Sequence, residues 1–380
     1  MYNISTLNKI SPVGLANLSS KYTISDDVSS STGILVRSQD MHEMEFGKYL
    51  LGIARAGAGV NNIPLDVCAE KGIVVFNTPG ANANAVKELV LAGLLLSARN
   101  IPAAMAWATT LTDNVSKTVE KGKGQFAGSE IKGKTLGVVG LGAIGSMVAN
   151  AASDLGMNVI GYDPYFSVKA AHSLYPCVGV VNSMEDLLPK CDYVTIHVPA
   201  MGSTNGMFNK EVYDLMNDGT VLLNFSRDKL VNEADLLLAI SQGKVKEYLT
   251  DFPTDGLIGK EGVVLIPHLG ASTEEAEDNC ATMATLQLMD YIENGNIVNS
   301  VNFPEVNLGP VNGDNRIAIM TKGVDNPANL AIAMFPDLQI NSIVGKTKGD
   351  YGYALVSTNT DIKSVPSVDG VVRVRVIQDL

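Results

Sequence analysis

The sequence predicts an α/β protein whose main domain is a doubly wound parallel sheet. Strand-like and helix-like segments alternate along the middle of the chain with short polar links, which is typical of parallel strands joined by crossover helices. A glycine-rich segment, residues 140–145, joins one predicted strand to one predicted helix. The chain has 380 residues, of which 46% are hydrophobic and 18% charged, so it can bury large cores and is expected to form two or three domains.

The middle region carries the clearest alternation. Its predicted strands are residues 135–139, 158–162, 193–198, 221–225, 245–250 and 263–266. Its predicted helices are residues 147–155, 184–188, 210–216 and 232–240. Because a strand and the next parallel strand need a crossover between them, this order predicts one parallel sheet with helices on both faces.

A smaller α/β domain is predicted around this middle region. The signals before it are strands at 33–37 and 72–76 and a helix at 85–98. A long helix at 274–293 then brings the chain back. We therefore expect a discontinuous first domain of residues 1–97 and 280–305, and a middle domain of residues 98–279.

The end of the chain predicts a separate small module. Residues 306–315 are rich in Asn, Gly and Pro, a composition typical of a linker. Residues 316–380 follow as a strand, helix, strand, strand, strand unit. Its predicted elements are residues 316–320, 329–334, 340–346, 353–356 and 371–376.

The glycine-rich segment predicts a Rossmann dinucleotide site. Gly140 permits a tight turn from strand to helix, Gly142 lets the backbone approach a pyrophosphate, and Gly145 lets helix and strand pack closely. The alternative is a glycine-rich turn in some other α/β protein. The turn residues expected against the cofactor are Gly140, Gly142, Ala143, Ile144 and Gly145.

An acidic residue at the end of the next strand indicates which dinucleotide binds. Asp163 closes the predicted strand 158–162, where a carboxylate can accept hydrogen bonds from the ribose hydroxyls of NAD. The same carboxylate would repel the additional phosphate of NADP. The expected cofactor is therefore NAD.

Few side chains qualify as the base that hydride transfer from an alcohol needs. Of four histidines, His42 and His172 lie in polar stretches, and His197 follows a buried strand, where it could cap the sheet or touch the cofactor. His268 follows another strand, at the edge where open parallel sheets bind ligands. Arg227 ends a strand at the same edge and is either a surface cap or an anion clamp.

Composition excludes several classes of partner. A net charge of −12 argues against nucleic acid and anionic membranes. The longest apolar stretch, residues 89–98, is about half the length needed to cross a bilayer. Four widely spaced cysteines favour reduced thiols over disulfides or a metal site, so we expect a cytoplasmic protein without a metal.

Five segments together resemble the D-isomer-specific 2-hydroxyacid dehydrogenases, in the branch that carries a C-terminal ACT domain. These segments are residues 54–63, 72–82, 133–145, 224–227 and 267–276, and the resemblance covers about residues 33–380. It implies a flavodoxin-like substrate domain, a Rossmann NAD domain and an α+β ACT domain. The implied activity is NAD-dependent oxidation of 3-phospho-D-glycerate, with hydroxypyruvate, glyoxylate or another D-2-hydroxyacid as the alternative substrate class. A third possibility is an NAD-sensing protein without enzymatic activity.

The resemblance also implies roles for single residues. Arg227 matches the arginine that holds the substrate carboxylate and C2 oxygen, and His268 matches the catalytic base. Asp251 matches the aspartate that binds the nicotinamide carboxamide. The other residues implied next to the cofactor are Thr195, His197, Pro199, Phe225 and Ser226.

The carboxylate behind the histidine departs from the family pattern. Asp255 stands where the family usually has a glutamate, with one residue fewer after Asp251. A carboxylate paired with the imidazole would raise the pKa of the histidine by favouring its charged form. Asp255 is the expected partner, and Asp251 and Glu261 are the alternatives.

A loop in the first domain resembles the family's substrate loop. Its backbone N–H groups are implied to bind the substrate carboxylate, and its arginine to meet a phosphate; the alternative is a glycine turn with a solvated arginine. The residues concerned are Arg55, Gly57, Gly59, Val60 and Asn61. Lys121 and Lys123 could add positive charge near a partner subunit's site, although a solvated charge run is the simpler interpretation.

The resemblance further implies partners. ACT domains of this branch often bind serine across a dimer interface, so an amino-acid effector and a homodimer or homotetramer are expected. This chain has Ala328 where a glycine is usual and Asp325 where an amide is often seen, while Asn341 keeps a second contact position. The module could therefore serve either for serine inhibition or for dimerisation alone.

Overall fold

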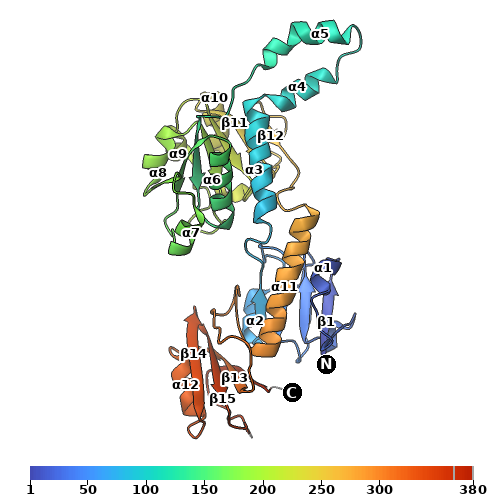
Figure 1. The fold of residues 1–380 in the computed structure, drawn as a ribbon, viewed down its shortest axis with the longest axis vertical. Coiled ribbons are helices and arrows are strands. Elements are labelled where there is room, and N and C mark those ends of the chain that lie inside the picture. The colour runs from blue at the N-terminus through green and yellow to red at the C-terminus, as the bar shows by residue number, and fades with distance from the viewer. Residues whose placement is uncertain (363, 379–380) are drawn as a thin grey trace. The chain divides into compact units, whose positions relative to one another are not determined.

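The structure, a computed structural model, describes residues 1–362 and 364–378. Its chain forms two compact units. Unit 1 consists of Met1–Ala81 and Glu274–Leu380, and unit 2 consists of Asn82–Thr273. Figure 1 labels several of the elements in each unit.

Unit 2 is built on a seven-stranded parallel sheet with the order β12-β11-β10-β9-β6-β7-β8. The strand order reverses between β6 and β9, which is the doubly wound arrangement predicted from the sequence. The strands are β6 (Thr135–Val139), β7 (Asn158–Tyr162), β8 (Gly179–Val181), β9 (Tyr193–Ile196), β10 (Thr220–Asn224), β11 (Val245–Thr250) and β12 (Val263–Leu265).

Helices cover both faces of this sheet and give it two cores. On one face, α3 and α6 pack over side chains that include Leu136, Val138 and Leu223. The alternate residues of the same strands, such as Val139 and Leu222, join the core under the helices of the other face. The helices of unit 2 are α3 (Ala83–Ala98), α4 (Ile101–Ala108), α5 (Val115–Gly122), α6 (Ala143–Asp154), α7 (Val168–Ser173), α8 (Met184–Leu187), α9 (Lys210–Asp214) and α10 (Glu233–Ser241), with short 3₁₀ turns η2 (Lys123–Phe126), η3 (Leu188–Lys190) and η4 (Asp228–Leu230).

Helices α4 and α5 form an arm that extends away from the sheet of unit 2 (Figure 1). Neither helix has a buried residue. Both begin after an asparagine with positive φ, Asn100 at +50° and Asn114 at +48°, which interrupts the helical path. The exposed helix α4 nevertheless has the apolar sequence Ile-Pro-Ala-Ala-Met-Ala-Trp-Ala.

Unit 1 contains a five-stranded parallel sheet with the order β2-β1-β3-β4-β5. The long helix α11 packs on one face with Ala284 and Leu288, while Cys68 of α2 lies in the core of the other face. The elements of this part are β1 (Tyr2–Leu7), α1 (Pro12–Leu15), β2 (Tyr22–Ile24), η1 (Val28–Ser30), β3 (Gly33–Val36), β4 (Gly52–Arg55), α2 (Leu65–Glu70), β5 (Val74–Phe76) and α11 (Glu274–Asn294).

The end of the chain forms a four-stranded antiparallel sheet with the order β14-β15-β13-β16. Helix α12 covers one face of this sheet (Figure 1). The element order agrees with the predicted strand, helix, strand, strand, strand module. The elements are β13 (Asn315–Lys322), α12 (Pro327–Met334), β14 (Ile340–Lys348), β15 (Tyr351–Thr358) and β16 (Val371–Ile377).

The C-terminal sheet is joined to the rest of unit 1 by a continuous core and by arginines. Tyr353 and Leu355 of β15 belong to the same hydrophobic cluster as Leu288 of α11. Arg316, which is 2% exposed, donates to the backbone oxygens of four residues. Its acceptors are the oxygens of Asn294 at 3.0 Å, Gly309 at 2.7 Å, Leu308 at 3.3 Å and Pro310 at 3.0 Å.

Two further arginines on β16 act in the same way. Arg375 donates to the oxygens of Tyr291 and Ile292 and stacks over the Tyr291 ring at 4.8 Å. Arg373 donates to the Leu50 oxygen at 2.6 Å and to the Gly72 oxygen at 3.2 Å. The last turn of α11 has no basic residue of its own, so cations from the C-terminal sheet compensate its partial negative charge.

The compact units divide at 81/82 and 273/274, whereas the sequence suggested divisions at 97/98 and 279/280. The first difference arises because α3 packs on the sheet of unit 2: a Cβ on Gly93 would come within 3.1 Å of the Phe225 ring. The residues predicted as a linker, 306–315, lie in unit 1 together with the module that follows. The predicted domain scheme remains a prediction.

Within the described part of the chain, no single helix is both long and apolar enough to cross a membrane. Only α3 and α4 taken together reach that length and composition, and they are bent by 68° at their junction. All four cysteines are free thiols; Cys68, Cys191 and Cys280 are buried and Cys177 is exposed.

Candidate functional site

The glycine-rich turn lies at the carboxyl end of β6, where the strand order reverses. Gly140 has a φ of +94°, and a Cβ at this position would come within 2.5 Å of the His197 oxygen. A Cβ on Gly145 would come within 1.9 Å of the Gly140 oxygen. By contrast, no described atom lies within 4 Å of the Cβ position of Gly142. The turn therefore leaves its backbone open at Gly142, as a bound pyrophosphate requires.

Helix α6 begins directly after this turn. No side chain caps its N-terminus in the described structure, so the first N–H groups point toward the open side of the turn. Ala143 is exposed and Ile144 is half-buried in the first turn of the helix. This is the arrangement in which a helix N-terminus stabilises a phosphate.

Asp163 is held against the glycine turn by two backbone groups. Its Oδ2 accepts from the Leu141 N–H at 2.8 Å, and its Oδ1 accepts from the Tyr165 N–H at 2.8 Å. The carboxylate is half-buried at the end of β7. Its position next to the turn fits the ribose contact that the sequence predicts.

His197 follows β9 and is uncharged. Burial lowers the pKa of its imidazole to about 3. Its Nε2 lies 2.9 Å from the Thr195 hydroxyl, while its buried Nδ1 has no partner among the described residues. Pro199, two residues on, is exposed, and its oxygen accepts from the Thr204 hydroxyl at 2.6 Å. These residues lie beside the glycine turn, because the His197 backbone contacts Gly140.

Three neighbouring strands bring the predicted chemistry together. Arg227 follows β10, Phe252 follows β11 and His268 follows β12, and β11 lies between the other two strands in the sheet. The Arg227 guanidinium lies over the Phe252 ring, 5.7 Å from its centroid. The His268 ring packs against the same Phe252 ring with centroids 4.5 Å apart. Arg227 and His268 are both exposed, as side chains that meet a substrate must be.

The strand end before Arg227 is fixed by polar contacts. Asn224 is fully buried, and its Nδ2 donates to the Arg227 oxygen at 2.8 Å and to the Tyr248 hydroxyl at 3.1 Å. The Ser226 hydroxyl donates to the Ile196 oxygen at 2.7 Å. Phe225 is in the core, so a contact of this residue with the cofactor would involve its backbone.

Asp251 is a fully buried carboxylate at the end of β11. Its Oδ2 accepts from the Gly270 N–H at 2.8 Å, whereas its Oδ1 has no partner in the described part of the chain. Burial raises the pKa of this carboxyl, and the Gly270 N–H and the charges of His268 and Arg227 oppose that shift. A buried oxygen without a donor fits the amide of a nicotinamide, so the residues present fit NAD.

Asp255, the predicted partner of His268, lies elsewhere in the loop. Its side chain is exposed and makes no hydrogen bond or ion pair with any described residue. Of the two alternatives, Glu261 is also exposed, and Asp251 is the carboxylate whose pKa responds to the charge of His268. The role of Asp255 stays a prediction.

The predicted substrate loop of unit 1 starts at Arg55, the last residue of β4. Gly57 has a φ of +154°, and a Cβ there would come within 2.1 Å of the Arg55 Nη1. The loop is thus shaped around its own arginine. Gly59 and Val60 are half-buried and Asn61 is exposed.

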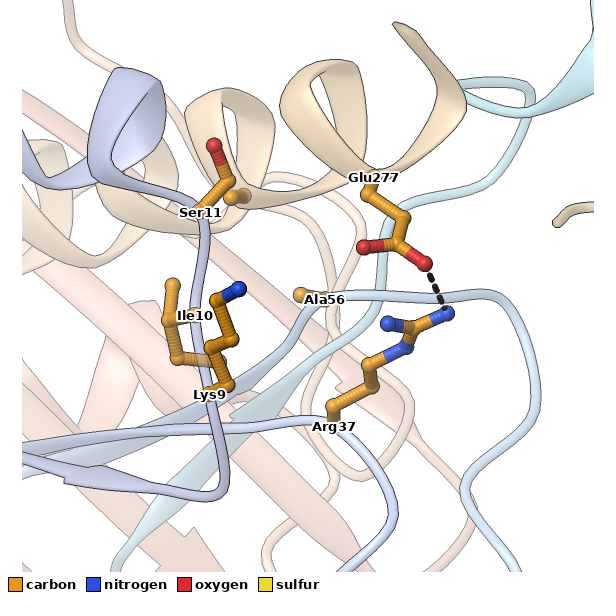
Figure 2. A pocket seen from close by; sticks show the side chains of 7 residues that line it. Lys9, Ile10, Ser11, Arg37, Ala56 and Glu277 are labelled. Carbon is orange, nitrogen blue, oxygen red and sulfur yellow. Dashed lines mark ion pairs between the residues drawn. The ribbon is translucent and has the colours of Figure 1, made fainter. Parts of the chain in front are cut away.

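A small pocket lies beside this loop, at the carboxyl ends of β1, β3 and β4 (Figure 2). Arg37 pairs there with Glu277 of α11 at 2.7 Å. Lys9 and Ala56 line the same pocket. The sequence analysis did not select Arg37, although it ends an apolar strand just as Arg227 does, and that signal could have identified it.

Comparison with known proteins places this architecture in a family. Residues 91–270 match the D-isomer specific 2-hydroxyacid dehydrogenase family, NAD binding domain. The chain is 31% identical over 364 residues to the D-3-phosphoglycerate dehydrogenase of Haemophilus influenzae, covering 91% of this chain and 86% of that protein. It is 34% identical over 320 residues to the Methanocaldococcus jannaschii enzyme of the same name, covering 80% of this chain and 59% of that protein.

Solved structures share the fold. The TT0316 protein from Thermus thermophilus has a TM-score of 0.64 at 25% identity, covering 79% of this chain and 99% of that one. The NAD⁺-bound 3-phosphoglycerate dehydrogenase of Entamoeba histolytica has a TM-score of 0.62 at 23% identity, covering 79% of this chain and 98% of that one, and shows the fold alone.

The extent of the match differs between relatives. The chain spans about half the length of several curated relatives, 59% for the M. jannaschii protein and 53% for the human one. It spans 86% of the H. influenzae protein. The predicted α/β fold and NAD-binding domain are confirmed. The chain belongs to the D-isomer-specific 2-hydroxyacid dehydrogenase family.

Proposed function

We propose that the chain catalyses the NAD-dependent oxidation of 3-phospho-D-glycerate to 3-phosphohydroxypyruvate, the first step of L-serine biosynthesis. The observation that carries the proposal is the placement of Arg227 and His268 on one phenylalanine ring, at the ligand-binding edge of a sheet with a dinucleotide turn. The names of the H. influenzae and M. jannaschii relatives support the choice of substrate.

The proposed chemistry assigns one task to each side chain. Arg227 binds the substrate carboxylate and the C2 oxygen, because a guanidinium can donate to both at once. His268 takes the proton of the C2 hydroxyl and returns it in the reverse direction. NAD, when bound, accepts the hydride from C2. Asp251 would hold the nicotinamide carboxamide through its free Oδ1, and Asp163 the adenosine ribose.

A carboxylate that stabilises the protonated imidazole completes this scheme. Asp255 is our proposed partner of His268, by its place in the family pattern. Asp255 makes no hydrogen bond or ion pair with His268 in the described structure, so the pairing requires a change in the position of the Asp255 side chain.

Positive charge in unit 1 supports a phosphorylated substrate over a smaller acid. Lys9, Arg37 and Arg55 follow or end three adjacent strands of one sheet at its carboxyl edge. Arg37 is paired with Glu277, and Lys9 and Arg55 place further positive charge at this edge, which suits an anion with more than one charge.

A comparison of two substrates tests this choice. We expect kcat/KM for phosphohydroxypyruvate to exceed that for hydroxypyruvate by about a hundredfold, because charge-assisted contacts to the phosphate contribute about 3 kcal/mol. Arg37→Ala should reduce this ratio mainly by raising KM for the phosphorylated acid. A preference of the wild-type protein for hydroxypyruvate or glyoxylate would replace the proposed substrate.

The arm of unit 2 supports assembly with a second copy of the chain. Helix α4 exposes an apolar sequence, with Met105 63% exposed, and no residue of α4 or α5 is buried in the described chain. Exposed apolar helices of this kind mark interfaces. We expect a mass in solution of a dimer or tetramer, measured by light scattering, and a shift toward the monomer for Met105→Glu. A wild-type monomer would contradict this assignment.

The C-terminal module is proposed as an ACT domain that carries either an amino-acid effector or a dimer contact. Ala328, the departure from the usual glycine, packs against Gly345 of β14, where a Cβ would lie 2.9 Å from the alanine methyl. The methyl is therefore accommodated inside the module. Asn341 already donates to Asn359 at 2.9 Å, and Asp325 is exposed.

A further inference from the structure

The loop after β11 is held in place on both sides of Phe252. Before it, the Asp251 carboxylate accepts from the Gly270 N–H at 2.8 Å. After it, the Thr254 hydroxyl donates to Glu233 Oε2 at 2.5 Å. Gly256 lies next to this contact, and a Cβ there would displace the Glu233 carboxylate, since it would lie 1.6 Å from Glu233 Oε1. The loop is thus fixed to α10 and to the segment that carries His268.

The backbone at Phe252 is held as well, because its N–H donates to the Thr250 hydroxyl at 3.1 Å. The ring is half-buried and lines a small pocket together with Tyr248 and Leu257, both of which are buried. A half-buried ring on a backbone held in this way can serve as a surface on which neighbouring side chains pack.

The two neighbours are the two side chains that the proposed function needs. Arg227 lies over the ring at 5.7 Å, a distance at which a guanidinium is attracted to the ring face. His268 contacts the ring at 4.5 Å with an angle of 45° between the planes. Both are long or rotatable exposed side chains, and the ring limits the positions that each can take.

The sheet topology explains why Phe252 lies between Arg227 and His268. Because β11 lies between β10 and β12, a residue just past the end of β11 lies between the residues that follow the other two strands. In this chain the phenylalanine directly follows the buried carboxylate of Asp251. The side chains of Asp251 and Phe252 then point to opposite sides of the backbone, one into the core and one toward Arg227 and His268.

We propose that Phe252 is a positioning residue that sets the separation and orientation of Arg227 and His268 for a 2-oxoacid substrate. The proposal rests on the proposed function. The ring makes no bond to the reacting atoms. It acts by restricting Arg227, which should affect substrate binding, and His268, which should affect proton transfer.

Three variants test the role. Phe252→Leu keeps an apolar side chain and removes the ring, and Phe252→Tyr keeps the ring. Phe208→Leu makes the same change at a fully buried phenylalanine of the same unit, whose ring packs against Tyr213. The measurements are kcat and KM for phosphohydroxypyruvate, KM for NADH, and the thermal midpoint. We expect Phe252→Leu to lower kcat/KM for the oxoacid by about tenfold or more, through both kcat and KM. KM for NADH should change less than twofold, and Phe252→Tyr should restore activity.

The control separates positioning from stability. Phe208→Leu should lower the thermal midpoint and leave kcat per folded molecule unchanged. If Phe252→Leu behaves like Phe208→Leu, the positioning role is overturned while the proposed function stands. If none of the 2-oxoacids tested causes the wild-type protein to oxidise NADH, the proposed function fails and the positioning role fails with it.

Discussion

Replacing His268 by alanine is expected to lower turnover at least a thousandfold. The histidine is the exposed imidazole at the carboxyl end of β12, in contact with the same ring as Arg227. Removal of a general base costs typically two to four orders of magnitude. The affinity for NADH, measured by fluorescence, should change less than about threefold, because the glycine turn and Asp163 belong to other strands.

A second histidine provides the control for this prediction. His172 is exposed in α7, and we assign it no role in the chemistry. His172→Ala should keep kcat and KM near the wild-type values. Turnover that survives in His268→Ala, or an equal loss in His172→Ala, would show that the base lies elsewhere.

Replacing Arg316 by methionine is expected to loosen the C-terminal sheet and the end of α11. The variant leaves four backbone oxygens without their charged donor, among them that of Asn294, the last residue of α11. Buried acceptors without a donor cost about 1–3 kcal/mol each, and partial access of water reduces the sum. We therefore expect the local free energy of opening to fall by about 3 kcal/mol.

Hydrogen exchange measures this effect element by element. Amides of β13 and the last turns of α11 should exchange about a hundredfold faster in Arg316→Met. Lys346→Met is the matched control, since Lys346 is an exposed residue of the same sheet and should change stability by less than about 0.5 kcal/mol. Equal exchange in Arg316→Met and the wild-type protein would mean that the arginine does not join the sheet to α11.

The dinucleotide fold could be predicted from the sequence because its signals are local. Strands 135–139, 158–162 and 245–250 have the predicted bounds, and the turn at Gly140 has the positive φ that only glycine adopts freely. Arg227 and His268 were selected as candidates from their places at strand ends, and their roles were inferred from the family resemblance. Both inferences use neighbours in the sequence together with the rule for parallel sheets.

The remaining features depend on contacts between distant residues. Helices α4 and α5 were not predicted, because each is only eight residues long and a segment this short gives a weak helical signal in the sequence. The position of Phe252 between Arg227 and His268 follows from the order of three strands, and the sequence does not display that order. The C-terminal sheet is attached through Arg316, Arg373 and Arg375, which donate to main-chain oxygens. Because every residue has a main-chain oxygen, the sequence does not indicate which oxygens these arginines bind.

The central claim is that Arg227 and His268 serve a dehydrogenase with NAD. The most direct test mixes the purified wild-type protein, NADH and phosphohydroxypyruvate, and follows the absorbance of NADH together with the formation of 3-phospho-D-glycerate. We expect one molecule of NADH to be consumed for each molecule of 3-phospho-D-glycerate formed. Tight binding of NADH without its oxidation by phosphohydroxypyruvate, hydroxypyruvate or glyoxylate would contradict it, and would indicate an NAD-sensing protein instead.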